Sequence, residues 1–124
     1  MTKLILAIAI IESSLNPNAV GDGGKAVGIM QIHPCVITDV NYFCKSNYKN
    51  SDRRDTEKSF EICQKYLTYW GSVYEERTEL KCTAEVYAKI WNGGPFGWKK
   101  EGAVKERLDR YWFKVQQELN RLQK

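Results

Sequence analysis

Three short stretches decide most of this chain: ESSLNPNAV at residues 12–20, GIMQI at 28–32 and WNGG at 91–94. The first places a single carboxylate, Glu12, near the end of a very apolar segment. The second is a turn that opens on glycine and carries a glutamine, and the third breaks another helical stretch. A carboxyl in apolar surroundings keeps its proton at a raised pKa and can act as a general acid. One acid on an apolar helix, with amides from two turns, suits cleavage of a sugar polymer.

Apolar residues recur at helical spacing along most of the chain, which predicts an all-α fold. The first helix carries Leu4 and Leu15 on one face and ends before Asn16-Pro17, because a residue preceding proline is biased away from helical geometry. The same spacing predicts further helices from Pro34 to about Phe43, from a cap at Asp55 through Tyr74, from Leu80 to Trp91 and from Val104 to Leu122. No alternating strand pattern of useful length is present, although residues 35–40 are ambiguous.

Composition fits one globular domain spanning residues 1–124, since 124 residues with 43% hydrophobic content can bury a real core. The net charge of +4 is spread along the chain. This charge favours attraction to anionic polymers such as bacterial envelope glycans. No dense run of Lys and Arg indicates nucleic-acid binding. We expect a monomer.

The chain has four cysteines, Cys35, Cys44, Cys63 and Cys82, and one histidine. Their spacing lacks the close pairs of a zinc site, so we expect no bound metal. The even count favours two disulfides formed in an oxidising compartment, and three pairings are open. The alternative is four buried thiols in a reducing cytosol.

No stretch is long enough to span a membrane. Residues 1–11 imitate a signal peptide, since Lys3 precedes an apolar run from Leu4 to Ile11. That run is only eight residues long, and no cleavage site of small residues follows it. We interpret the segment as the first core helix, so export requires a leader outside this stretch or a phage lysis system.

Four blocks of the chain resemble the lysozyme-like muramidases of the soluble lytic transglycosylase and goose-type lysozyme families. Those families read roughly Glu-Ser-x-x-Asn-Pro-x-Ala, Gly-Leu-Met-Gln-Ile, Ala-Tyr-Asn-Ala-Gly, and then a late tyrosine in a terminal helix. Here the blocks occur in the same order over about residues 4–115. The resemblance implies a helical lysozyme-like domain that acts without a cofactor on peptidoglycan glycan strands, at the cell wall in an extracellular or periplasmic location.

The resemblance implies that Glu12 protonates the glycosidic oxygen between N-acetylmuramic acid and N-acetylglucosamine. It also implies substrate contacts by the residues that match the other family positions, namely Ser13, Met30, Gln31, Asn92 and Tyr111. Each has a local alternative. A helix-end serine bonds its own backbone, methionine and tyrosine pack in cores, and asparagine ends helices in the left-handed region.

Two positions depart from the family pattern. Trp91 stands where the families commonly have tyrosine, and an indole can stack on a sugar but lacks the hydroxyl acceptor. Tyr87, one turn earlier, is the candidate to replace that hydroxyl. His33 follows Gln31 by two residues and is a candidate for the cleft floor, although a lone histidine is more often structural.

Both families cleave the same bond by different routes. An inverting hydrolase needs a second carboxylate to activate water, at about 6.5–9.5 Å from the acid. Asp22 lies nine residues before Gln31. At the position that this residue resembles, goose-type lysozymes carry aspartate and transglycosylases often carry serine. Turn chemistry explains an aspartate among glycines equally well. We favour hydrolysis narrowly, with a non-hydrolytic lytic transglycosylase as the alternative and a catalytically silent glycan-binding or phage structural protein as the second.

Overall fold

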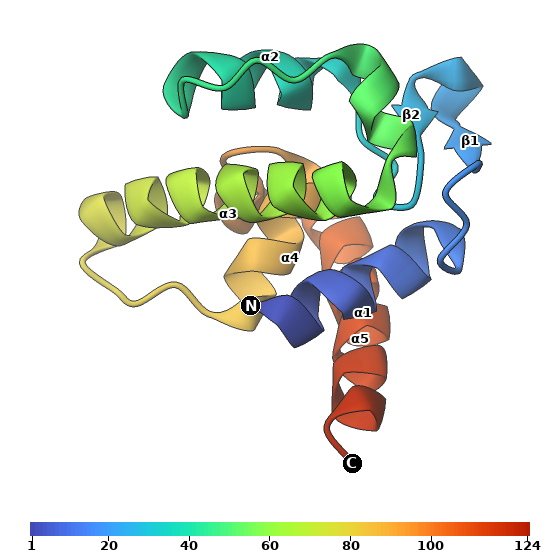
Figure 1. Cartoon of the computed structure of the whole chain (residues 1–124). Helices are drawn as coiled ribbons and strands as arrows, with labels where there is room; N and C mark the ends of the chain where they lie inside the picture. Colours follow the sequence, from blue (N-terminus) through green and yellow to red (C-terminus); the bar gives the residue numbers. More distant parts are fainter. The chain divides into compact units, whose positions relative to one another are not determined.

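The computed structural model describes all residues 1–124. It confirms the predicted all-α fold class (Figure 1). The helices are α1 (Thr2–Ser13), α2 (Pro34–Phe43), α3 (Thr56–Thr78), α4 (Ala84–Gly93) and α5 (Gly102–Leu122). A ribbon of β1 (Val20–Gly21) and β2 (Ala26–Val27) and three short 3₁₀ turns, η1 (Asp22–Gly24), η2 (Asn50–Arg54) and η3 (Gly97–Lys99), complete the chain. None of the helices combines the length and apolar character needed to traverse a bilayer.

The chain forms two compact units. The first unit comprises Met1–Ala7 and Leu67–Lys124, and the second unit comprises Ile8–Tyr66. Helices α1 and α3 each contribute residues to both units. The single domain that we expected over residues 1–124 stays a prediction.

The second unit is built around the β1–β2 ribbon, which pairs Val20 with Val27 in antiparallel register. The turn between the strands needs left-handed backbone, and glycines at positions 23 and 24 adopt it at low cost. Helix α2 begins at Pro34 as expected, because proline is pre-organised for a first helical position. The ambiguous residues 35–40 are helical. Side chains from α1, the ribbon, α2 and α3 form the core, among them Ile8, Met30, Ile32, Val40, Ile62 and Cys63.

The first unit contains α4 and α5, which pack on each other through a small residue. A Cβ at Gly93 would approach a methyl of Leu108 to 2.8 Å, so the glycine permits the close contact. Leu108 and Val115 are completely buried along the amphipathic face of α5. The Lys89 ammonium of α4 binds the Asp109 carboxylate of α5 at 2.7 Å. This ion pair joins the two helices beside their apolar contact.

The observed ends of the helices can be compared with the predicted ends residue by residue. The Asp55 carboxylate accepts the backbone N–H of Lys58 at 2.9 Å and so caps α3 as expected. Leu15 and Leu80, however, were wrongly assigned to helical faces. Leu15 has a positive φ of 65° and is exposed, because α1 already ends at Ser13. Leu80 is exposed and precedes Thr83, whose hydroxyl caps α4.

Candidate active site

Glu12 lies in the last turn of α1, half-buried, and its surroundings include the core of the second unit. The nearby charge of Glu12 is a contributor to the shifted pKa of Cys63. Complete burial first, and the Glu12 charge second, hold the pKa of that thiol well above its usual value. The Glu12 carboxylate therefore lies within electrostatic reach of the buried Cys63 thiol. The apolar environment that the sequence predicts for the acid stays a prediction.

Ser13 ties the end of α1 to the turn that follows β2. Its hydroxyl lies 2.7 Å from the Ile29 carbonyl oxygen and 3.3 Å from the Ala9 carbonyl oxygen, so the shorter contact is the one across the loop. The same oxygen accepts the backbone N–H of Asn16 at 3.2 Å. The hydroxyl thus contacts its own helix backbone, as the local alternative predicts, and also links the helix end to the loop.

The turn at residues 28–31 requires glycine at its first position. Gly28 has a φ of +87° and donates its N–H to the Ala19 carbonyl at 2.8 Å. A Cβ at Gly28 would stand 1.8 Å from the carbonyl oxygen of Arg53. The tight turn predicted from the sequence is therefore confirmed. Glycine is needed at its first position because the backbone there passes close to the backbone of Arg53.

Arg53 was missed by the sequence reasoning. Its guanidinium donates to the carbonyl oxygens of Lys25 and Ile32, each at 2.9 Å, and so holds both ends of the segment that contains β2. No local sequence signal distinguishes this arginine, because its partners lie 21 and 28 residues away.

Gln31 uses its amide within the loop. The Nε2 group donates to the Ala19 carbonyl at 3.1 Å and to the Gly28 carbonyl at 3.0 Å. Its Oε1 lies against Gly21, where a Cβ would come within 2.6 Å of it. Met30 is completely buried, which corresponds to the core role weighed for it.

Asp22 and His33 form a pair that the sequence reasoning did not join. The His33 Nε2 atom lies 2.8 Å from the Asp22 Oδ2 atom. The His33 side chain is 38% exposed and the Asp22 side chain is 68% exposed. Asp22 has a φ of +51°, so its place in the turn itself favours Asp or Asn. The contact links the η1 turn to the residue that precedes α2.

The other predicted site residues, Tyr87, Trp91, Asn92 and Tyr111, belong to α4 and α5 of the first unit, and all are half-buried. The Asn92 side-chain oxygen accepts from the Arg107 guanidinium at 2.5 Å. Asn92 does not end its helix in the left-handed region, because Gly94 takes the positive φ of 89°. The structure thus groups the predicted residues into two sets, one in each unit.

The Tyr87 side chain makes its contacts within the first unit. Its ring lies against Gly71 of α3, where a Cβ would approach it to 2.5 Å. Its hydroxyl interacts electrostatically with the Cys82 thiol. Burial first, followed by the effects of Cys82, raises the pKa of Tyr87.

All four cysteines are free thiols in this structure, so the two disulfides expected from the even count are not formed. The Cys44 and Cys82 sulfurs lie 3.9 Å from the carbonyl oxygens of Lys65 and Thr83. Burial raises the pKa of Cys82 to about 11. No group of three or more His, Cys, Asp or Glu side chains is placed to hold a metal ion.

These features define a class: a helical, lysozyme-like fold in which an acidic residue ends an apolar helix beside a Gly-Ile-Met-Gln turn. A family model described as the transglycosylase SLT domain matches residues 1–112, and the chain belongs to that family. The chain is therefore an enzyme of the kind that cleaves peptidoglycan, as lytic transglycosylases and lysozymes do. Neither the curated proteins nor the solved structures contain a match to it.

Proposed function

We propose that Glu12 is the general acid for cleavage of the β-1,4 bond between N-acetylmuramic acid and N-acetylglucosamine. The observation that carries the proposal is the half-buried position of Glu12 in the last turn of α1, next to the Gly28–Gln31 turn. Ser13 beside it is fixed to the Gly28–Gln31 turn, which limits the motion of the helix end. A half-buried carboxyl on a helix end that is held in place suits proton donation.

The reaction that we propose is hydrolysis with inversion. Glu12 gives its proton to the glycosidic oxygen, which leaves as the 4-hydroxyl of N-acetylglucosamine. Asp22 takes a proton from a water molecule, whose oxygen forms the new bond to C1 of N-acetylmuramic acid. The exposed Asp22 carboxylate can reach water, and its partner His33 limits the directions in which it points.

The residues that we propose for sugar contacts include Trp91, Asn92 and Tyr111. Trp91 supplies an apolar face for stacking on a pyranose ring. Asn92 and Tyr111 supply polar groups, and Arg107 fixes the orientation of the Asn92 amide. Gln31 would act mainly by holding the turn, since both contacts of its amide nitrogen are backbone carbonyls of the same loop. Residues 1–124 would act as one catalytic domain, as a monomer, on cell-wall strands outside the cytoplasm.

A second route deserves the same test because the matched family model carries the name transglycosylase. In that route the 6-hydroxyl of N-acetylmuramic acid attacks C1, and Glu12 accepts the hydroxyl proton after giving up its own. No water is consumed, and Asp22 is then only a turn residue.

Mass spectrometry of the muropeptides released from purified cell walls separates the two routes. Hydrolysis leaves reducing ends, whereas transglycosylation leaves 1,6-anhydro ends that are lighter by one water. We expect mainly reducing ends. Mainly anhydro ends would overturn the hydrolytic route, and no cleavage at all would overturn the proposed activity.

A further inference from the structure

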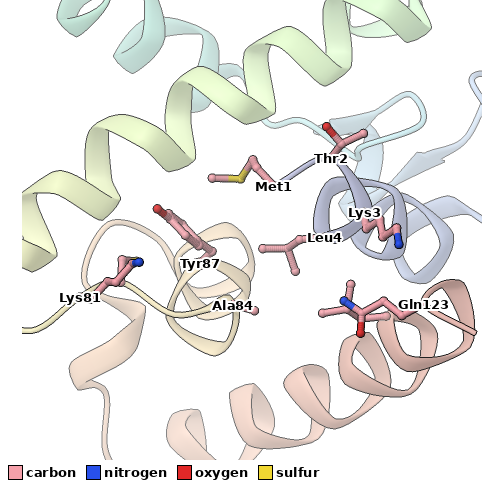
Figure 2. Close-up of a pocket in the computed structure, with 10 residues that line it drawn as sticks. Met1, Thr2, Lys3, Leu4, Lys81, Ala84, Tyr87 and Gln123 are labelled. Carbon is pink, nitrogen blue, oxygen red and sulfur yellow. The ribbon is translucent and has the colours of Figure 1, made fainter.

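The first unit contains a pocket that none of the proposed catalytic steps uses. Its volume is about 600 Å³, and residues from α1, the segment before α4, α4 and the end of α5 line it. Figure 2 shows Leu4 directed toward Tyr87 and Ala84, with Lys81 and Lys3 on opposite sides of the group. A volume of this order is typical of sites that bind small ligands, which range over about 300–1,000 Å³.

The lining combines an apolar floor with a basic rim. Leu4 and Cys82 are buried, and Ala84 and Leu119 add further apolar surface. The two lysines are the charged side chains of the lining, and neither Asp nor Glu is present in it. A pocket with this charge pattern attracts a ligand that carries carboxylates on a small apolar body.

We propose that this pocket binds the stem peptide of peptidoglycan. The inference rests on the proposed function, because it takes peptidoglycan as the substrate. Stem peptides carry alanine methyl groups and several free carboxylates. The methyl groups fit the surface formed by Leu4, Ala84 and Leu119, and the carboxylates fit the ammonium groups of Lys3 and Lys81. The pocket would thus select peptide-bearing strands over bare glycan.

A second hollow of the first unit, about 540 Å³ in volume, is also basic but fits this ligand less well. Glu101 contributes a carboxylate to its lining. Two of its three cations are already engaged, because the Arg77 guanidinium and the Lys99 ammonium lie 4.8 and 5.8 Å from the centre of the Phe96 ring. No residue of that lining is a buried aliphatic side chain.

The test uses the full chain carrying Glu12→Gln, so that no substrate is cleaved. The probe is the free stem tetrapeptide, alanyl-γ-glutamyl-diamino acid-alanine, titrated while amide NMR signals are recorded; the peptide-free disaccharide is the comparison. We expect shifts centred on Leu4, Ala84 and Tyr87. Lys3→Glu and Lys81→Glu should each weaken peptide binding about tenfold, since each converts an attraction into a repulsion.

The matched control is Lys114→Glu, which makes the same change in net charge on an exposed face of α5 outside the pocket. It should change the affinity less than about twofold, the residual long-range effect of charge. Lys3→Glu is not expected to unfold α1, because an acidic side chain is favourable in the first turn of a helix.

Kinetics on the wild-type background give the second readout. Lys3→Glu and Lys81→Glu should raise KM on intact walls and leave KM on peptide-stripped glycan unchanged. The proposal is overturned if the peptide binds elsewhere, does not bind, or binds equally well after both reversals. A wild-type chain that binds the peptide but never cleaves walls would instead refute the proposed activity.

Discussion

Replacing Asp22 by Asn separates a catalytic carboxylate from a turn residue, because the two roles predict effects of different size. The contact between Asp22 and His33 is short, 2.8 Å, but both side chains are open to water, at 68% and 38% exposure. Exposed ion pairs of this kind contribute about 0–1 kcal/mol to stability. Asn also tolerates the left-handed backbone at this position. We therefore expect a fall in melting temperature of at most a few degrees.

A water-activating base predicts a far larger loss of rate. General acid–base catalysis typically contributes about a hundred- to ten-thousand-fold. That range corresponds to about 3–5 kcal/mol of activation free energy. Asp22→Asn should therefore lose most of the release of reducing ends while it unfolds almost like the wild type.

The assay is muropeptide release from purified walls, quantified by mass spectrometry, with a thermal melt of each variant. Asp55→Asn is the matched control, since Asp55 is also exposed and Asn caps helices equally well. It should leave the rate unchanged. His33→Gln should lower the rate less than Asp22→Asn, because the carboxylate remains and loses only its orienting partner. An unchanged rate in a folded Asp22→Asn protein would refute the reasoning and favour transglycosylation by Glu12 alone.

Two further predictions concern packing and thiol chemistry. Gly28→Ala should destabilise the protein by about 3 kcal/mol or more, because the new side chain adds left-handed backbone strain and clashes with the Arg53 carbonyl. Gly23→Ala has open space around the new methyl group and should cost only about 1–2 kcal/mol, from the backbone strain alone. Equal denaturant midpoints for the two variants would contradict this. Alkylation at mild pH should label the exposed Cys35 rapidly and Cys63 only after unfolding, because burial withholds the reactive thiolate. Cysteines that resist alkylation in the denatured, unreduced protein would contradict the free-thiol state.

Much of the helical architecture could be predicted from local pattern. The proline at position 34, the cap at Asp55 and the glycine break after α4 act within a few residues, so the sequence alone reveals them. Periodicity failed at Leu15 and Leu80, where apolar side chains keep helical spacing beyond the point at which the backbone leaves the helix. Spacing describes side chains and contains no information on the φ of Ser14 or on the cap at Thr83.

The candidate site was only partly predictable for a related reason. Glu12 and the Gly28 turn belong to compact motifs, so the sequence and its family resemblance could name both as candidates. The partners that hold these motifs come from elsewhere in the chain. Arg53 reaches back to Lys25, and His33 meets Asp22 across 11 residues. Such pairings depend on the tertiary fold, and no spacing rule selects them from the many exposed polar residues of a 124-residue chain.

The most direct test of Glu12 as the general acid is the rate of wall clearing by Glu12→Gln, measured beside its thermal melt. The amide keeps the shape of the side chain but carries no transferable proton. We predict a loss of at least about a hundredfold with little change in melting temperature. Clearing within about threefold of the wild-type rate, well below the usual contribution of a general acid, would contradict the assignment.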